Sequence, residues 1–316
     1  RYGSKEIKDL FGEERRLQYL LDVEAALARA HAKVGNIPKS AATEITKKAS
    51  TKYVKVARVT EIEKETKHDI MSVTRALAEQ CKGDAGKYIH LGATSYDIVD
   101  SANALQFDDS LDLLKKELKA LRTTFVNLAK KHKKTIMVGR THGQHTIPIT
   151  FGLKMAAYAM EVDRHMERLF EAKTRILVGK LSGAVGTGAA LGKNALKLQE
   201  EMHKELKIGT EDVATQIVCR DRYNELLGIL CNIATSMEKF GQEIRNLQRD
   251  EIREVAEAFE AKKQVGSSTM PHKNNPITCE QICGLARVVR GFILPTYENS
   301  IQWHERDLCN SSSERF

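Results

Sequence analysis

The stretch Asp97–Lys131, DIVDSANALQFDDSLDLLKKELKALRTTFVNLAKK, decides the fold class. It contains no proline, and its apolar residues recur at spacings of three and four, which is the period of an α-helix. A segment of more than thirty residues is longer than a typical helix of a globular protein. Long helices bury their apolar faces against one another, so the stretch predicts a helix bundle.

Other segments share this helical period, while the alternation typical of strands is nearly absent. They are Pro148–Ile176, Asp221–Ala261 and Ile277 to about Trp303. We expect the last to begin with Asn275 as its N-cap and Pro276 as its first helical residue. The chain is therefore predicted to be all-α.

The N-terminal region also shows helical spacing, but in shorter pieces. One piece runs from Glu13 to Val34 and a second from about Val56 to Gln80. The apolar stripe of the first piece consists of Leu17, Leu20, Leu21, Ala25 and Ala28. We predict a small helical domain over residues 1–96, followed by a long-helix bundle over residues 97–316.

The segments between the expected helices differ in composition from the helices. Gly, Ser, Thr and His gather in Lys87–Tyr96, Gly139–Ile147, Leu181–Gly192 and Gln264–Asn275. Loops and helix ends are where a bundle assembles a functional site. We therefore look for functional residues in these four segments.

The composition excludes several classes of protein. The sequence has no apolar run of about 18 residues that could cross a membrane, and no secretory leader is visible. Six cysteines occur without a CxxC pair, which disfavours zinc ribbons and disulfide frameworks and favours the reducing cytoplasm. The net charge of +8 comes from lysines interleaved with glutamates, a pattern of solvated helix faces rather than of a nucleic-acid interface.

The segment Gln264–Pro276, QVGSSTMPHKNNP, is the first candidate for chemistry. A helix that starts after it points free backbone N–H groups toward the loop, where an anion would bind. Lys273 adds a positive charge that could stabilise a carboxylate as it takes up further charge. The alternative interpretation is a flexible Ser/Gly hinge before a capped helix.

This segment resembles the GSSxMPxKxNP signature of the fumarase, aspartase and argininosuccinate lyase superfamily. The resemblance implies a helical fold of the fumarase type. It also implies that Ser267 is the general base, that Lys273 stabilises the resulting aci-carboxylate, and that Met270 and Asn275 contact the substrate. A lone serine is a poor base, so Lys273 or the N–H groups of the loop would have to favour its alkoxide.

The second motif is Gly139–Pro148, GRTHGQHTIP, which lies before an expected long helix. Two histidines three residues apart could bind a metal, but no third ligand with suitable spacing accompanies them. The motif resembles the TH motif of the adenylosuccinate lyases, in which His142 would be the general acid and Thr141 would contact the substrate. By the same resemblance, Glu280 is the carboxylate partner that raises the pKa of His142 and orients its ring.

Two further motifs lie in the predicted N-terminal domain. Taken alone, Glu65–Ile70, ETKHDI, is a solvated polar face of a helix. It resembles the HD motif of the same lyases, where His68 would position or protonate the substrate and Lys67 and Asp69 would hold it.

The segment His90–Asp97, HLGATSYD, resembles the substrate loop of this family. Thr94 and Ser95 would bind a carboxylate and His90 would contact the substrate. Either hydroxyl could also cap the helix that follows, so the two roles do not compete.

A last group of residues separates the adenylosuccinate lyases from their relatives. Arginines and hydroxyls are good phosphate ligands. By resemblance, Gln216 would bind the substrate, and the contacts to the nucleotide ribose and phosphate would be Arg1, Tyr2, Arg306, Ser311 and Arg315. The segment Leu181–Gly188, LSGAVGTG, lacks the order of a dinucleotide or P-loop motif, and we interpret it as a tight turn.

Together these resemblances imply β-elimination of fumarate from adenylosuccinate, giving AMP, and from the succinylcarboxamide ribonucleotide SAICAR, giving AICAR. They imply no metal and no organic cofactor, and a cytoplasmic homotetramer whose sites draw motifs from different subunits. Related chains continue into another helical domain, which we expect to be missing here. The alternatives are argininosuccinate lyase, a carboxymuconate cycloisomerase and a non-catalytic crystallin-like relative. Intact Ser267, His142, Lys273 and Glu280 disfavour the last.

Overall fold

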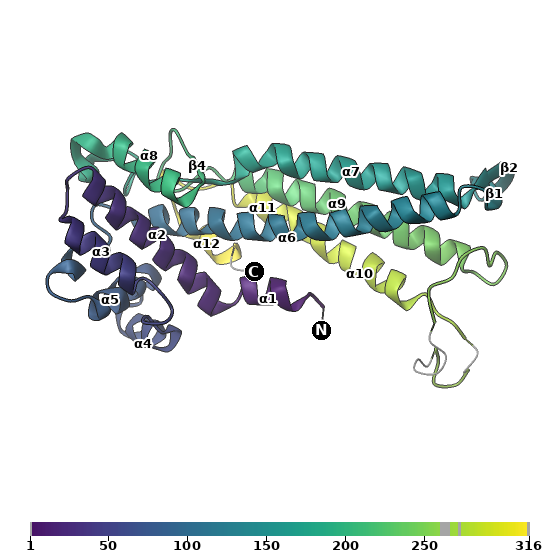
Figure 1. The fold of residues 1–316 in the computed structure, drawn as a ribbon, viewed down its shortest axis with the longest axis horizontal. Coiled ribbons are helices and arrows are strands. Elements are labelled where there is room, and N and C mark those ends of the chain that lie inside the picture. The colour runs from purple at the N-terminus through teal and green to yellow at the C-terminus, as the bar shows by residue number, and fades with distance from the viewer. Residues whose placement is uncertain (1, 260–265, 271–272, 315–316) are drawn as a thin grey trace. The chain divides into compact units, whose positions relative to one another are not determined.

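Helices dominate the computed structural model of the chain, which describes residues 2–259, 266–270 and 273–314 (Figure 1). The all-α prediction is confirmed. The α-helices are α1 (Lys5–Leu10), α2 (Glu13–Lys33), α3 (Lys39–Lys48), α4 (Val56–Thr66), α5 (Asp69–Gln80), α6 (Ser95–Lys131), α7 (Phe151–Ile176), α8 (Ala195–Leu206), α9 (Asp221–Leu247), α10 (Ile277–Gly291), α11 (Ile293–Glu298) and α12 (Cys309–Ser313). The short elements are the 3-10 helices η1 (Ala85–Tyr88) and η2 (Ala189–Asn194) and the strands β1 (Ile136–Thr141), β2 (Gln144–Thr150), β3 (Val178–Gly179) and β4 (Gly209–Thr210).

The chain forms two compact units. The first unit comprises the residues up to Leu114, Ala172–Arg222 and the residues from Asn299 onward. The second unit comprises Lys115–Glu171 and Tyr223–Glu298. Each of the long helices α6, α7 and α9 therefore contributes residues to both units. The domain boundary that the sequence suggests near residue 96 stays a prediction.

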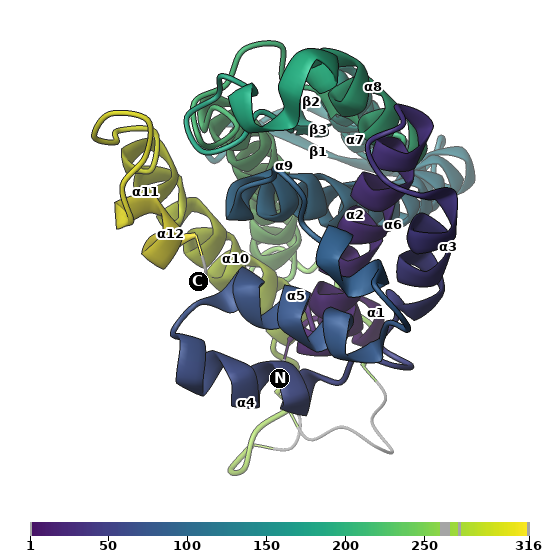
Figure 2. The same ribbon diagram turned by 90° about the vertical axis from the view of Figure 1, so that its left-hand side faces the viewer.

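The core of the first unit forms around α2, which packs against α3, α5 and α8 (Figure 2). All five residues of the apolar stripe expected on this helix are buried, with Leu21 fully enclosed. Leu27, Ile45 and Leu77 are equally inaccessible. Each such side chain contributes about 1.5–3 kcal/mol of hydrophobic free energy. This core supports the loops that follow α4 and η1.

The single helical piece expected over Val56–Gln80 is wrong, because the chain breaks between α4 and α5. Lys67 adopts a left-handed backbone (φ 53°), and His68 is extended and caps α5 through its own ring. The ETKHDI motif therefore occupies a helix junction rather than a continuous polar face. Such a junction fixes the position of His68 more tightly than an exposed helix surface would.

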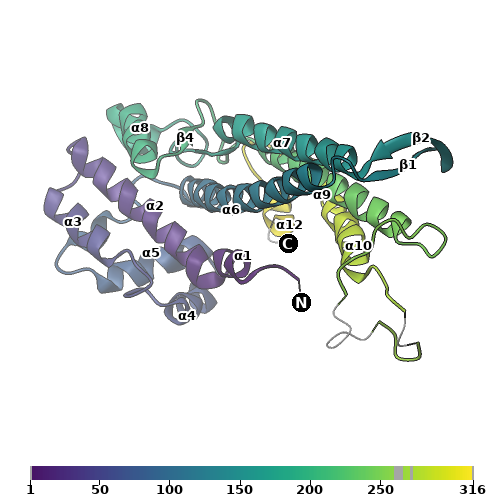
Figure 3. The ribbon, with the colours of Figure 1, turned by 45° about the vertical axis from the view of Figure 1, so that its right-hand side comes forward.

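The second unit is built from the later part of α6 together with α7, α9 and α10. Phe125, Tyr158 and Phe240 form an aromatic cluster with ring centroids 4.3–5.6 Å apart. Cys279 and Cys283 are buried free thiols on α10. Strands β1 and β2 extend as a hairpin beyond the first turn of α7 (Figure 3).

This hairpin corrects two predictions, because Gly139–Ile147 is not an open loop and Pro148 does not start a helix. Strands β1 and β2 pair in antiparallel fashion, with Thr141 opposite Gln144. The alternating stretch TIPIT favours a strand, and its proline is tolerated because a two-stranded ribbon has only edges. His142 and Gly143 form the two-residue turn with φ of 54° and 76°, which is typical of a type I′ hairpin.

The last two long segments are shorter than expected. Helix α9 ends at Leu247, whose carbonyl accepts the N–H groups of Glu254 and Val255, so the chain folds back instead of continuing. Residues 260–261 of the expected helix lie outside the described residues. Helix α10 ends at Gly291, α11 follows, and Trp303 is not helical.

The expected N-cap of α10 is also wrong. Pro276 occupies the cap position and α10 begins at Ile277. The side chain of Asn275 instead donates a hydrogen bond to the carbonyl of Gly266.

Across the described ranges, none of the helices combines the length and the apolar character needed to cross a membrane.

Candidate active site

The predicted substrate loop, residues 90–97, lies in the first unit at the start of α6. The N–H of Asp97 donates to the carbonyl of Thr94 at 3.0 Å, and the carboxylate of Asp97 accepts the N–H of Thr94 at 2.7 Å. The carboxylate of Asp97 thus satisfies a donor at the start of the helix. The hydroxyls of Thr94 and Ser95 are left available for a substrate carboxylate.

Asp97 also joins this loop to the LSGAVGTG turn. Its carboxylate forms an ion pair with Lys180, and both side chains are fully buried. It accepts the N–H groups of Ser182 at 3.1 Å and Gly183 at 3.2 Å as well. Our sequence reasoning did not assign this pair, although an acidic residue two positions after Ser95 was a visible signal. A buried carboxylate that accepts so many donors fixes both loops in place.

His68 comes close to the predicted substrate loop. Its Nδ1 accepts the N–H of Met71 at 3.4 Å and lies 3.5 Å from a carboxylate oxygen of Asp69. Nε2 lies 3.5 Å from the Ser95 hydroxyl. Asp69 lies beside it at the first position of α5, and Lys67 is exposed. The two motifs therefore lie next to each other within one unit.

His90 is held by a partner that the sequence did not reveal. Its Nδ1 lies 2.6 Å from Oε1 of Glu24, a fully buried side chain on α2. Burial alone would lower the pKa of His90, but the charge of Glu24 and its hydrogen bond outweigh burial and raise that pKa. A charged residue in the buried stripe of α2 was the only signal of this contact.

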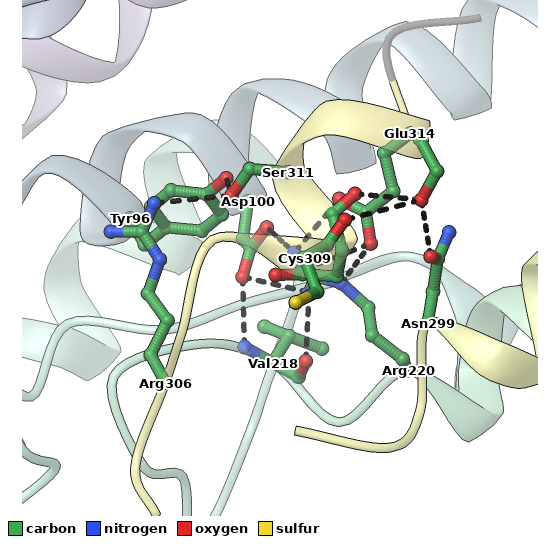
Figure 4. A network of polar contacts seen from close by, with 11 residues as sticks. Tyr96, Asp100, Val218, Arg220, Asn299, Arg306, Cys309, Ser311 and Glu314 are labelled. Carbon is green, nitrogen blue, oxygen red and sulfur yellow. Dashed lines mark hydrogen bonds and ion pairs between the residues drawn. The ribbon is translucent and has the colours of Figure 1, made fainter. Parts of the chain in front are cut away.

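Two of the predicted nucleotide contacts, Arg306 and Ser311, lie in one cluster of the first unit together with Gln216 (Figure 4). The guanidinium of Arg306 lies 3.8 Å from the ring centroid of Tyr96. It donates to Oε1 of Gln216 at 2.8 Å and to the hydroxyl of Ser311 at 3.1 Å. The Ser311 hydroxyl is also 2.6 Å from that of Tyr96. These groups therefore form hydrogen bonds with one another here. A bound phosphate would replace some of these hydrogen bonds with its own.

Three further residues complete the predicted nucleotide set. Tyr2 is half exposed. Arg1 and Arg315 lie outside the described residues.

An ionic anchor missed by sequence reasoning holds the segment that carries Ser311 (Figure 4). The fully buried guanidinium of Arg220 donates to both oxygens of Asp100, at 3.0 and 3.1 Å. Its Nε donates to Glu314 at 2.6 Å. The side chain thereby links α6 to the end of α12 and holds Ser311 in position beside Tyr96.

The serine loop lies in the second unit. The hydroxyl of Ser267 accepts the N–H groups of Thr269 and Met270, each at 3.2 Å. These are the loop donors that an alkoxide at Ser267 would require. The backbone N–H of Lys273 donates to Met270, and a Cβ at Gly266 would lie only 1.7 Å from the carbonyl of Lys273. Only glycine permits this closure of the loop.

The first N–H groups of α10 bind an anion, as expected. The anion is a carboxylate of this same chain rather than of a ligand. The carboxylate of Glu257 accepts the N–H groups of Thr278 at 3.1 Å and Cys279 at 2.6 Å. Burial opposes the charge, yet the hydrogen bonds from Cys279 and Thr278 lower the pKa of Glu257. The side chain of Gln248 links the two segments at the base of the serine loop, because it accepts from the N–H of Glu257 and donates to the carbonyl of Asn274. We call this base the stem of the loop.

His142 and Glu280, the predicted acid and its partner, are both exposed in the second unit. His142 lies at the tip of the hairpin beside Thr141, and Glu280 lies in the first turn of α10. Within the described part of this single chain, they form no hydrogen bond or ion pair with each other. The side chain of Lys273 likewise makes no such contact with Ser267. The described residues also hold no group of three His, Cys, Asp or Glu placed to bind a metal ion.

Comparisons with known proteins agree with this arrangement. A family model described as lyase matches residues 4–291. The adenylosuccinate lyases of Pyrococcus horikoshii and Methanocaldococcus jannaschii are 54% and 52% identical to this chain over 315 residues. These alignments cover 100% of this chain and 70% and 68% of those proteins.

Solved structures are similar as well. The 3-carboxy-cis,cis-muconate lactonizing enzyme from Pseudomonas putida has a TM-score of 0.90 and 35% identity over 98% of this chain and 70% of its own. A fumarate lyase from Mesorhizobium sp. BNC1 has a TM-score of 0.88 and 34% identity over 100% of this chain and 71% of its own.

Proposed function

This chain belongs to the lyase family, and we propose that it is an adenylosuccinate lyase. It would release fumarate from adenylosuccinate to give AMP, and from SAICAR to give AICAR. The curated relatives of that name, which match the whole chain, support the substrate class. The proposal places the enzyme in the cytoplasm and assigns it no metal and no organic cofactor.

The observation that carries the elimination chemistry is a pair of hydrogen bonds. The backbone N–H groups of Thr269 and Met270 donate them to the hydroxyl of Ser267. A serine hydroxyl with an ordinary pKa is a poor base, and two donors at 3.2 Å stabilise its alkoxide. Ser267 takes the proton from the carbon next to a carboxylate of the substrate. The electron pair moves into that carboxylate, which Lys273 stabilises as an aci-carboxylate.

His142 then completes the β-elimination as the general acid. As the carbon–nitrogen bond breaks, its imidazolium donates a proton to the departing purine nitrogen. Glu280 orients the ring of His142 once a second subunit brings the two together. His68 assists from the first unit, because its Nε2 lies beside the Ser95 hydroxyl, where the succinyl carboxylate would bind.

Substrate binding is divided among the remaining residues of the motifs. Thr94 and Ser95 hold a carboxylate. The cluster of Arg306, Ser311 and Gln216, with its half-buried guanidinium, suits the ribose and phosphate. Further contacts are assigned to Arg1, Tyr2, Lys67, Asp69, His90, Thr141, Met270, Asn275 and Arg315.

The proposal includes a homotetramer in which different subunits supply the serine loop, the hairpin and the His68 motif. An apolar stripe on α10 supports it: Ile277, Leu285 and Val288 are each more than a third exposed, as is Phe292 just after the helix. Successive members of this set are eight, three and four positions apart, so they line one face of the helix. A contiguous exposed apolar face of this kind is typical of an oligomer interface.

One experiment tests the substrate class directly. The purified protein is incubated separately with adenylosuccinate, argininosuccinate and 3-carboxy-cis,cis-muconate, and fumarate or lactone is measured by chromatography. The proposal expects fumarate from adenylosuccinate alone. Fumarate from argininosuccinate would contradict the purine assignment, and lactone from the muconate would favour the activity named for the Pseudomonas putida neighbour.

A further inference from the structure

Helix α2 carries two buried polar residues that both reach the substrate loop. Glu24 and His31 lie seven positions apart, which places them on one face of the helix two turns apart. Oε1 of Glu24 lies 2.6 Å from Nδ1 of His90, and Nε2 of His31 lies 2.9 Å from the carbonyl of Leu91. One face of α2 thus contacts two consecutive residues of the loop, His90 and Leu91.

The two contacts differ in charge. Nδ1 of His31 accepts from the amide of Asn36 at 3.0 Å, so the ring is neutral and donates from Nε2 to the Leu91 carbonyl. Burial lowers the pKa of His31, which agrees with that neutral form. His31 therefore fixes the loop backbone without adding charge.

Glu24 makes a different kind of contact. Its side chain is fully buried, and its second oxygen, Oε2, has no hydrogen-bond partner. A buried carboxylate is costly unless a cation lies against it. Lys180, a nearby buried cation, is already paired with Asp97. The charge of Glu24 is thus balanced by His90, whose Nδ1 is the hydrogen-bonded atom.

The loop backbone is strained in the same place. His90 has a φ of 61°, which is unusual for a residue with a side chain. Gly92 has a φ of 69°, and a Cβ there would lie 2.8 Å from Leu191. Such strain persists only where the surroundings hold it. The contacts of Glu24 and His31 supply that hold.

We infer that Glu24 is a positioning residue that keeps His90 protonated and fixed, so that the second ring nitrogen, Nε2, binds an anionic oxygen of the substrate. The inference rests on the proposed function, because it takes the substrate to be a purine nucleotide that bears carboxylates and a phosphate. Glu24 touches no substrate itself and acts only through His90.

The neighbouring charges agree with this role. Besides Glu24, the carboxylate of Asp97 on α6 favours the His90 cation. The charge of Asp97 is largely cancelled by Lys180, and His31 is neutral. Glu24 is therefore the group whose removal most lowers the pKa of His90.

The test compares Glu24→Gln with the parent enzyme. Glutamine keeps the shape and a hydrogen bond but loses the charge, so we expect KM for adenylosuccinate at pH 7.5 to rise by about 10- to 100-fold. We expect kcat to change far less, because His90 is not assigned to proton transfer. Ile45→Ala is the matched control, since it opens a cavity in the same core away from the loop and should lower Tm without raising KM.

Two more variants separate positioning from damage. Glu24→Asp keeps the charge and should recover part of the lost affinity. His90→Gln should raise KM as Glu24→Gln does, and the double variant should be no worse than either single one. An unchanged KM in Glu24→Gln, or additive losses in the double variant, would overturn the inference.

A second readout does not depend on turnover. NMR with histidine labelled at the ring should show His90 titrating above 6.5 in the parent and well below it in Glu24→Gln. A His90 that titrates below 6.5 in the parent protein overturns the inference even if the variant fails to fold. If the titration behaves as expected but adenylosuccinate is not cleaved, the proposed function fails while the Glu24–His90 coupling stands.

Discussion

The substrate loop of the first unit and the serine loop of the second are held by different means. The substrate loop is fixed from the interior by buried charges, with Asp97 on Lys180 and His90 on Glu24. Among the described residues, the hydroxyl of Ser267 is bonded by backbone N–H groups of its own loop. His142 and Glu280, assigned to the same chemistry, point to solvent.

This difference between the two loops indicates which part of the site is complete in one chain. The core of the first unit pre-organises the groups proposed to bind the substrate. His142 and Glu280 are exposed and do not contact each other within the described residues, which agrees with our proposal that a second copy completes this part of the site. The predictions that follow would break or sharpen this contrast.

The largest expected effect is on catalysis at the serine loop. Replacing the proposed base in Ser267→Ala should lower kcat for adenylosuccinate by about 10²- to 10⁴-fold. The Tm should stay unchanged, because the hydroxyl stabilises only its own loop. Ser268→Ala, an exposed neighbouring serine, is the control and should keep a kcat near that of the parent. Similar losses in both variants would mean that the loop, rather than one hydroxyl, is what matters.

The next effect is on the stability of the first unit. Lys180→Met leaves the buried carboxylate of Asp97 without its cation and should lower the free energy of unfolding by about 3–5 kcal/mol. Lys173→Met removes a partly exposed lysine from Asp108 and Asp112 and should cost less than about 1 kcal/mol. Urea denaturation measures both. Equal costs would show that the interior of the first unit is not the source of its order.

A pH effect tests the same interior. Burial lowers the pKa of His203 to about 4, while its Nδ1 contacts the hydroxyl of Thr210 at 2.8 Å. Because the folded pKa is below the ordinary value of 6.5, the neutral ring's contribution is present above pH 6.5 and is lost as pH falls toward 4. In the parent protein, His203 should lower the free energy of unfolding by about 3 kcal/mol between these two pH values. His203→Gln should not show this decrease. Parallel stability curves for the two proteins would contradict this.

The smallest expected effect lies at the stem of the serine loop. Glu257→Gln weakens the cap on α10 and should cost about 1 kcal/mol of stability. It should also lower kcat modestly, because Ser267 and Lys273 lie on the loop that this cap closes. Glu251→Gln, a highly exposed change in the same segment, is the control for charge alone. No difference between the two would show that the stem does not position the loop.

The sequence predicts the helices well because period and length are local properties. The stripe of α2 and the full length of α6 follow from residues that lie next to one another. The hairpin at 136–150 could not be found this way, since its first strand has weak alternation and its second contains Pro148. The end of α9 at Leu247 depends on a return of the chain that helical spacing does not encode.

The candidate site divides in the same way. Ser267, His68 and Ser95 are found from motifs, because a motif records residues close in sequence. Glu24 and Lys180 are missed, because each touches its partner across more than sixty positions. Arg220 is missed for the same reason, since Asp100 and Glu314 are both distant in sequence.

The most direct test of this contrast is complementation between two inactive proteins. Ser267→Ala and His142→Ala are purified separately, mixed in equal amounts, dissociated and reassembled, and fumarate release is measured. If the serine loop and the hairpin of one site come from different subunits, intact sites form by chance and activity should recover to about a quarter of the parent value. If mixed oligomers form and activity does not return, each chain completes its own site and the account is contradicted.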